Sequence, residues 1–270
     1  MSIARIVAMT ALAALLLSTA QADAHELWLE PLRPAVAPGE EAAVDVKVGQ
    51  MLAGATYTYI TAYFKVFDFV DSAGCRPVVS TIGDQPAVHE ATGDAGLARL
   101  VYLSSPDFLT YKTFEQFEAF AQKDGQAAAI ARHRERGLPE TNFREAYTRS
   151  AKALIRVGDG AGADGPLGLP YEVIAEVNPF TASADAPIRA QILWQGAPAP
   201  GELAAIFRRA PDGAVALEHR TTDADGRIDI PAGKGFHLIS VVRLIEPDPE
   251  LAARTGVVWH SFWGSLSFHR

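Results

Sequence analysis

The apolar and polar positions in the first third of the chain alternate with a period of two. Val44, Val46 and Val48 alternate with small or charged residues, which is the spacing of a strand with one buried face. Residues 55–70 are rich in β-branched and aromatic side chains and predict one or two further strands. Residues 97–103 have the same character and follow a glycine turn. Short strands separated by turn signals are typical of a β-sandwich.

The period changes to that of a helix within residues 111–150. Phe114, Phe117 and Ala121 recur at the spacing of one helix face. A capping-box pair begins at Thr113, one residue before this apolar series. We therefore expect a helix to start there.

Two more helices are predicted in the same stretch. Residues 126–136 are rich in alanine and arginine and stop at Gly137, as helices often do. Asn142 is a suitable N-cap for a short third helix with the sequence FREAYTRSA. Strand character returns at residues 151–157. We expect a helical insertion at about residues 111–150 in the first sandwich.

The last part of the chain returns to strands. Residues 158–168 are rich in glycine, aspartate and alanine, which predicts a flexible linker. About six or seven strands follow, including YEVIAEV, IRAQILW, ELAAIFR, AVALEHR, FHLISVVRL and SFWGSLSF. The fold class predicted is mainly β, with two Ig-like or prealbumin-like β-sandwich domains. They occupy residues 25–157 and 169–270.

One turn in this region has the acidic spacing of a calcium loop. Asp223 and Asp225 precede Gly226. A calcium-binding EF-hand also needs a later bidentate glutamate and flanking helices. A strand follows here instead, so we predict a tight turn.

Residues 1–24 have the parts of a secretory signal peptide. Arg5 precedes the apolar run at residues 6–17, and an A-x-A cleavage site ends at Ala24. Cleavage there makes His25 the first residue of a periplasmic protein. No later apolar stretch approaches the ~20 residues needed to span a bilayer, so we expect no stable membrane insertion after cleavage. An uncleaved signal acting as an anchor is the alternative.

Composition narrows the function classes. The net charge is −8 and no basic stripe is present, which disfavours nucleic-acid binding. Cys75 is the only cysteine, so the exported chain has no internal disulfide and depends on an ordinary core. We expect Cys75 to be buried and inert by default. A thiol ligand and a dimer-forming cysteine are the alternatives.

A histidine at the start of the mature chain is the main chemical candidate. The α-amine and imidazole Nδ1 of His25 can close on one metal ion, and such nitrogen ligands suit nickel, copper, cobalt and zinc. The third mature residue is Leu27, so the amino-terminal square-planar motif that needs histidine there is absent. Glu26 is the candidate for an oxygen ligand or for a carboxylate that supports the site. The alternative is that cleavage merely leaves a histidine without a role.

The remaining motifs do not indicate an enzyme. The other six histidines form no H-x-H or H-x-x-x-H pair, and a structural role is expected for each. No nucleophile elbow, Walker loop, dinucleotide fingerprint, H-E-x-x-H or C-x-x-C is present. No catalytic residue is therefore predicted. We expect Trp259, Phe262 and Trp263 to pack in the core, with sugar stacking as the alternative.

Segments across the mature chain carry a family resemblance through their order. They are HELWLEP, AVAPGEEAAVDVKVGQ, GLARLVYLSSP, FEAF, REAYTRSAKALIRVG, GLPYEVIAEVNPF, QGAPAPG, TTDADGRIDIP and WHSFWGSLSF. Together they resemble a bacterial periplasmic family of unknown function that is described as NikM-like. Members of this family are often found beside nickel and cobalt uptake systems. The carboxy-terminal half also resembles the prealbumin or carboxypeptidase-regulatory type of sandwich.

The resemblance implies an accessory role in transition-metal uptake or handling, with His25 as the site residue. We predict that the protein binds nickel or cobalt, with copper or zinc also suited, and serves a membrane metal transporter. One alternative is a metal-free binding module for a sugar, a peptide or a partner protein. A second is an oxidative copper enzyme that uses His25 and another histidine.

Overall fold

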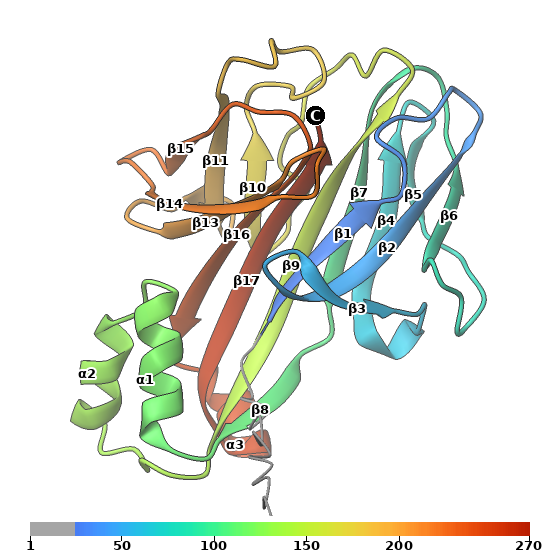
Figure 1. Cartoon of the computed structure of the whole chain (residues 1–270). Helices are drawn as coiled ribbons and strands as arrows, with labels where there is room; N and C mark the ends of the chain where they lie inside the picture. The colour runs from blue at the N-terminus through green and yellow to red at the C-terminus, as the bar shows by residue number, and fades with distance from the viewer. Residues whose placement is uncertain (1–24) are drawn as a thin grey trace, which may run out of the picture.

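The computed structural model describes residues 25–270 and confirms a mainly β protein (Figure 1). The predicted signal peptide and its cleavage site lie outside the described residues. Three sheets and a few helices make up the described part. Because the strands form stacked sheets, the predicted β-sandwich class is correct.

The largest sheet, here called the central sheet, has nine strands in the order β14-β13-β16-β17-β9-β7-β4-β5, with β8 also paired to β9. Their bounds are β4 Phe64–Asp71, β5 Gly74–Pro77, β7 Gly96–Ser104, β8 Asp107–Tyr111, β9 Phe143–Val157, β13 Leu203–Arg209, β14 Val215–Thr221, β16 Phe236–Ile245 and β17 Val257–His269.

Two smaller sheets cover the central sheet. The amino-terminal sheet contains β1 Glu26–Pro31, β2 Glu41–Gln50, β3 Ala53–Tyr57 and β6 Val88–Ala91. The carboxy-terminal sheet contains β10 Tyr171–Ala175, β11 Ile188–Trp194, β12 Ala197–Pro198 and β15 Arg227–Ile230. The helices are α1 Phe114–Lys123, α2 Ala128–Glu135, α3 Pro249–Thr255 and the short 3-10 helix η1 Thr61–Tyr63.

The two halves of the sequence share the central sheet. Strand β9 pairs antiparallel with β7 on one side and parallel with β17 on the other. Both long strands run side by side through the middle of the molecule in Figure 1. Residues 158–168 lie against this core: the Leu97 N–H donates to the Ala161 carbonyl at 2.8 Å, and the Asp164 side chain is fully buried.

Two hydrophobic cores lie on opposite faces of the central sheet. Alternate residues of a strand point to opposite faces, and β9 follows this rule. Ala151, Ala153 and Ile155 pack in the core under the amino-terminal sheet. Leu154 packs with Ile192 and other residues of the core under the carboxy-terminal sheet. The central sheet is therefore the common layer of two sandwiches.

The helices α1 and α2 pack on the same face of the central sheet as β1. Phe117 of α1 stacks on Trp259 of β17 at a ring separation of 5.7 Å, and Phe120 stacks on Trp263 at 6.0 Å. Both tryptophans are buried, so their predicted core role is confirmed. Farther along β17, the Ser265 hydroxyl donates to the Leu27 carbonyl of β1 at 2.8 Å. The helices and β1 consequently cover one continuous face of β17.

The predicted third helix is wrong. The sequence FREAYTRSA opens β9, a strand of 15 residues. Glutamate, alanine and arginine favour a helix locally, but pairing with β7, β8 and β17 determines the structure. Asn142 has a φ of +53° and precedes the strand instead of capping a helix. The helical part of residues 111–150 is therefore limited to α1 and α2.

The expectation of a buried Cys75 is also wrong. Cys75 is exposed and lies on β5, which pairs only with β4 at the edge of the central sheet. An edge strand has one open side, so its side chains receive less cover. Among the described residues, the helices lack the length and apolarity needed to cross a membrane.

Gly264 allows β10 to approach β17 closely. A Cβ at this position would lie 2.9 Å from the Tyr171 carbonyl oxygen and 3.0 Å from the Val241 side chain. The Gly264→Ala substitution should lower the free energy of unfolding by about 1–3 kcal/mol, because a packed backbone must move. Urea denaturation of a protein that comprises residues 25–270 measures the change.

Gly165→Ala is the matched control for this prediction. No atom lies within 4 Å of a Cβ built at Gly165, so this substitution should change stability by less than about 0.5 kcal/mol. A loss at Gly264 no greater than the loss at Gly165 would contradict the close approach.

Candidate functional site

The predicted metal ligand His25 lies directly before β1 and is partly buried. Its carbonyl oxygen accepts a hydrogen bond from Nη2 of Arg149, at 3.0 Å. Its imidazole Nδ1 is buried and has no hydrogen-bond partner among the described residues. Buried polar atoms are normally paired, so this nitrogen is available to a ligand beyond the described residues.

Glu26, the second predicted site residue, begins β1 and is only 5% exposed. One of its carboxylate oxygens lies 3.7 Å from Nζ of Lys123, at the end of α1. The other oxygen, Oε2, is buried and has no hydrogen-bond partner within residues 25–270. A buried carboxylate with a single long contact is poorly compensated, so a further cation near Glu26 would be stabilising.

These residues fit a transition metal only in part. The His25 imidazole and the Glu26 carboxylate, with the His25 amine that the predicted cleavage would free, are nitrogen and oxygen donors that suit nickel, cobalt, copper and zinc. Within residues 25–270 no group of three or more His, Cys, Asp or Glu side chains is placed to hold a metal ion.

A cavity of about 520 Å³ opens beside the first residues of β1. Leu27 contributes one wall, Tyr57 of β3 and Tyr63 of η1 another, and Tyr147 and Arg149 of β9 a third. Serine and threonine hydroxyls from the neighbouring loops also line it. Its size falls in the range of about 300–1,000 Å³ that small-molecule sites occupy.

The tyrosines of the cavity offer flat apolar surface and neutral hydroxyl groups. The rings of Tyr57 and Tyr63 lie 6.2 Å apart, and both are exposed. The Tyr147 hydroxyl donates to Asp107 at 2.6 Å. Burial, with a smaller contribution from Asp107, raises the pKa of Tyr147 to about 12. This hydroxyl is therefore protonated at neutral pH.

Arg149 provides the buried positive charge of the cavity. The residue is only 8% exposed, and its guanidinium lies 4.5 Å above the Tyr147 ring. Its Nη2 donates to the His25 carbonyl, whereas its Nε is buried and has no acceptor in the described part of the chain. Among the residues that the structure describes, Arg149 has no carboxylate at ion-pair distance. Its direct contacts are the His25 carbonyl and the Tyr147 ring, which are both uncharged.

A fully buried carboxyl group lies on the same strand, two positions before Tyr147. Glu145 accepts hydrogen bonds from the Tyr111 hydroxyl at 2.9 Å and from the Ser261 hydroxyl. Burial raises its pKa to about 7, although these two hydrogen bonds and the charge of Arg149 act in the opposite direction. Glu145 therefore changes protonation near neutral pH.

Several other histidines have structural partners. His133 is fully buried; its Nε2 bonds the Pro139 carbonyl at 2.9 Å, and its Nδ1 accepts from the Trp259 indole at 3.0 Å. His237 and His260 are buried, and burial lowers the pKa of each to about 4. These three side chains are therefore neutral parts of the core at neutral pH, as expected from their isolation in the sequence.

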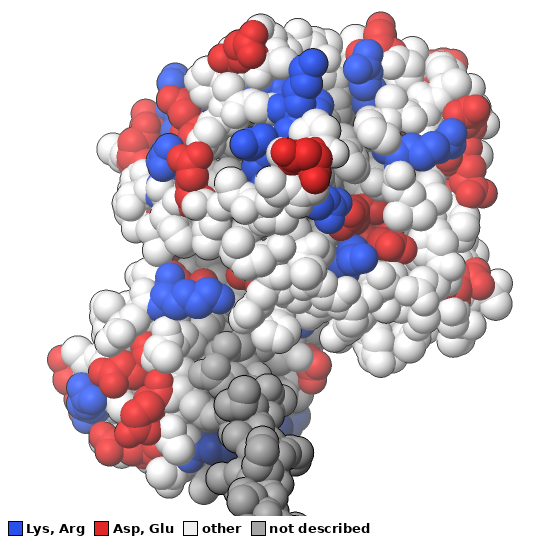
Figure 2. Space-filling model, viewed as in Figure 1, with Lys and Arg blue, Asp and Glu red and all other residues white. Residues whose placement is uncertain are grey.

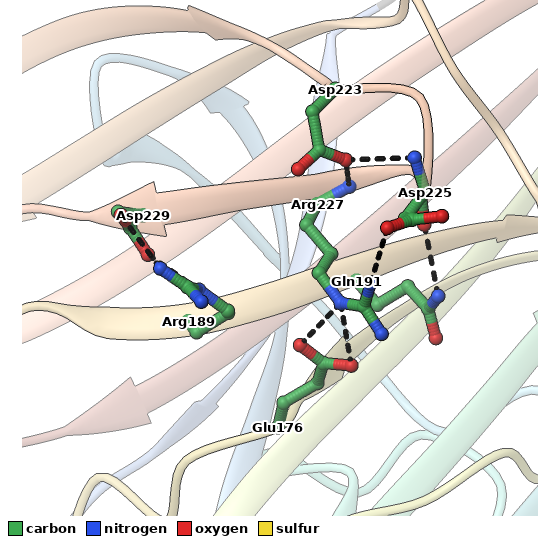
Figure 3. A network of polar contacts seen from close by, with 7 residues as sticks. All are labelled: Glu176, Arg189, Gln191, Asp223, Asp225, Arg227 and Asp229. Carbon is green, nitrogen blue, oxygen red and sulfur yellow. Dashed lines mark hydrogen bonds and ion pairs between the residues drawn. The ribbon is translucent and has the colours of Figure 1, made fainter.

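The acidic turn before β15 uses its carboxylates internally (Figure 3). Asp223 accepts from the backbone N–H groups of Asp225 and Arg227, at 2.9 and 2.8 Å. The Arg227 guanidinium bonds Glu176 and Asp225. The prediction of a tight turn is confirmed, because the side chains that resemble calcium ligands close the turn and its ion pairs.

Sequence reasoning missed Arg149 and its neighbours because it assigned their segment to a helix. Glu145, Tyr147 and Arg149 are spaced two residues apart and share one face of β9. The same spacing continues through Ala151 and Ala153, which are buried. Both faces of β9 mix polar and apolar residues and are largely buried, so the sequence carries no clear period of two that could have identified the strand.

The fold and the site define a double β-sandwich protein with a candidate binding site at the start of β1. The chain belongs to the family with a domain of unknown function designated DUF4198, whose model matches residues 22–243. A search of curated proteins finds no match.

A solved structure of the tetra-tandem repeat in the extending region of a large adhesion protein is 12% identical to this chain. The alignment covers 90% of this chain and 49% of that one, with a TM-score of 0.22. This chain therefore spans about half the length of the matched chain. The geometric likeness is too low to inform function.

Proposed function

We propose that this protein is a periplasmic accessory protein that binds a divalent transition metal at His25. Nickel and cobalt are the leading candidates, and copper and zinc suit the same donors. The observation that carries the proposal is the buried His25 Nδ1 without a hydrogen-bond partner. The signal-peptide pattern before His25 and the NikM-like resemblance of the ordered sequence segments support the same function.

The proposed site uses the α-amine and Nδ1 of His25 as a chelating pair. A free amine and a neutral imidazole bind metals only after losing their protons, so affinity falls in acid. Glu26 contributes either an oxygen ligand or a nearby negative charge. Few protein ligands leave coordination positions open, which suits transient binding and transfer to a membrane transporter.

Nickel titration of the mature, chelator-treated protein tests this proposal. Isothermal calorimetry should show one nickel ion per chain, and His25→Ala should weaken binding at least tenfold because it removes the imidazole. Glu26→Gln should weaken binding about 10- to 100-fold, the range found when a group that supports metal ligands is lost.

His219→Ala is the matched histidine control, because His219 lies on the exposed strand β14. Its nickel affinity should equal that of the unaltered protein. Unchanged affinity in His25→Ala would contradict the proposed metal site.

A metal-free binding module is the second candidate function. The tyrosine-lined cavity beside β1 is the specific observation that favours it. In this case the ligand would be an organic molecule that contacts the cavity walls, and no metal would be required.

A further inference from the structure

The cavity beside β1 contains a buried guanidinium, that of Arg149, with no carboxylate at ion-pair distance among the described residues. Strand β9 places Glu145, Tyr147 and Arg149 on one face. Glu145 accepts hydrogen bonds from Tyr111 and Ser261, whereas Tyr147 and Arg149 line the cavity. Figure 1 shows β9 passing beneath β1 toward β8.

Arg149 is set apart by its burial, because it is the one arginine classed as buried among the described residues, and other arginines without an ion pair, such as Arg99 and Arg270, are partly exposed. The side chains of Arg76, Arg209 and Arg243 remain 31%, 30% and 24% exposed, yet each forms an ion pair. Their partners are Asp71, Glu30 and Glu202, respectively. Arg149 is more deeply buried and has no such partner. A buried cation normally has a paired anion, so the missing partner points to an anionic ligand.

The position of the guanidinium suits a carboxylate. One donor, Nη2, holds the His25 carbonyl, and the adjacent Nε is buried without an acceptor. A planar carboxylate matches the planar donor fork of arginine. Because the Tyr147 ring covers one face of the guanidinium, the ligand must approach the edge of the guanidinium that faces the cavity.

A carboxylate beside the Tyr147 hydroxyl limits the negative charge that a ligand can carry. The Asp107 carboxylate accepts a hydrogen bond from the Tyr147 hydroxyl, and Asp107 also lines the cavity. Its carboxylate repels a ligand that carries several negative charges, which disfavours a phosphate ester. The exposed rings of Tyr57 and Tyr63 provide a surface for a flat apolar group. These walls together favour a singly charged ligand with an apolar body.

We propose that this cavity binds a small carboxylic acid with a flat apolar body, and that Arg149 is its anchor. The ligand carboxylate bonds the Arg149 guanidinium, and the apolar body lies against the tyrosines. This binding does not require the metal proposed for His25, so the two proposals fail or succeed separately.

Phenylacetate and its uncharged analogue phenylacetamide test the proposal. Both are titrated into metal-free mature protein and followed by NMR chemical shifts. Phenylacetate should bind at least tenfold more tightly than the amide, because only the acid supplies the missing charge. This comparison needs no variant, so it remains decisive if Arg149 also supports folding.

Variants then test whether Arg149 causes the tighter binding of the acid. Arg149→Gln should weaken phenylacetate binding at least tenfold and leave the amide affinity unchanged. Arg189→Gln is the control, because Arg189 is exposed and pairs with Asp229 away from the cavity; it should have no effect. Equal affinities for acid and amide, no binding of either, tighter binding of phenylphosphate, or full phenylacetate affinity in Arg149→Gln would each overturn the proposal.

Discussion

Replacing Lys152 by methionine should lower the free energy of unfolding by about 3–5 kcal/mol, the usual cost of removing one partner from a buried ion pair. The Lys152 side chain is 0% exposed, and its Nζ lies 2.9 Å from Asp164 and 3.2 Å from Glu172. Methionine fills similar space but leaves two carboxylates buried without their cation. Urea denaturation of the mature protein measures the loss.

The same substitution should release residues 158–168 from the core. Glu172 accepts backbone N–H bonds from Leu167, Gly168 and Leu169, and Asp164 accepts from the backbone of Ala175. Lys152 holds both carboxylates against β9. Amide hydrogen exchange in this segment should therefore increase in Lys152→Met.

Arg189→Met provides the control for the buried cluster. Arg189 and Asp229 form an ion pair in which both side chains are more than half exposed. Exposed ion pairs contribute little to stability, so this loss should be much smaller than the loss at Lys152. Similar losses at both positions would contradict the account of the buried cluster.

Glu145→Gln should stabilise the protein above pH 7 by about 3 kcal/mol at most. The folded pKa of Glu145 is raised to about 7 from the ordinary value of 4.5. The protonated carboxyl therefore favours folding fully below about pH 4.5, and this contribution is lost as the pH rises through 7. Glutamine stays neutral at every pH and can still accept from Tyr111 and Ser261.

The pH dependence of the stability difference measures this effect. Urea denaturation of both proteins between pH 4.5 and 8 should show a gain for Glu145→Gln that grows with pH. Glu246→Gln is the control: Arg132 lowers the pKa of the exposed Glu246 carboxyl, so this change should give no gain. A Glu145→Gln difference that does not vary with pH would contradict the raised pKa.

The local pattern of the sequence predicted much of the fold. The alternation of Val44, Val46 and Val48 corresponds to buried positions of β2, and Phe114 and Phe117 correspond to the buried face of α1. Each pattern depends only on residues that are close together in the sequence. Period and composition therefore suffice for these elements.

Pairing between strands that are distant in the sequence limited the prediction of the fold. Strand β9 contains residues that favour helices, yet it lies between β7 and β17, whose residues come from distant parts of the chain. The parallel pairing of Ser261 with Tyr147 leaves no local signal. For the same reason, sequence alone did not show that the central sheet serves both sandwiches.

The candidate site was predictable only at its amino-terminal end. The signal junction identified His25 and Glu26 as candidates without knowledge of the fold. The cavity combines Tyr57, Tyr63 and Arg149 from three separate elements. Whether an arginine lacks an ion-pair partner depends on its three-dimensional neighbours, so the anchor proposed for a carboxylate could not be recognised in the sequence.

The most direct test of the proposed metal function compares two forms of the mature protein. One begins at His25, and the other carries a single glycine before His25. The added residue converts the His25 amine into an amide, which is a poor metal ligand at neutral pH, but it keeps the imidazole. Nickel titration should show at least tenfold weaker binding to the extended form. Equal affinities for the two forms would contradict chelation by the amino terminus.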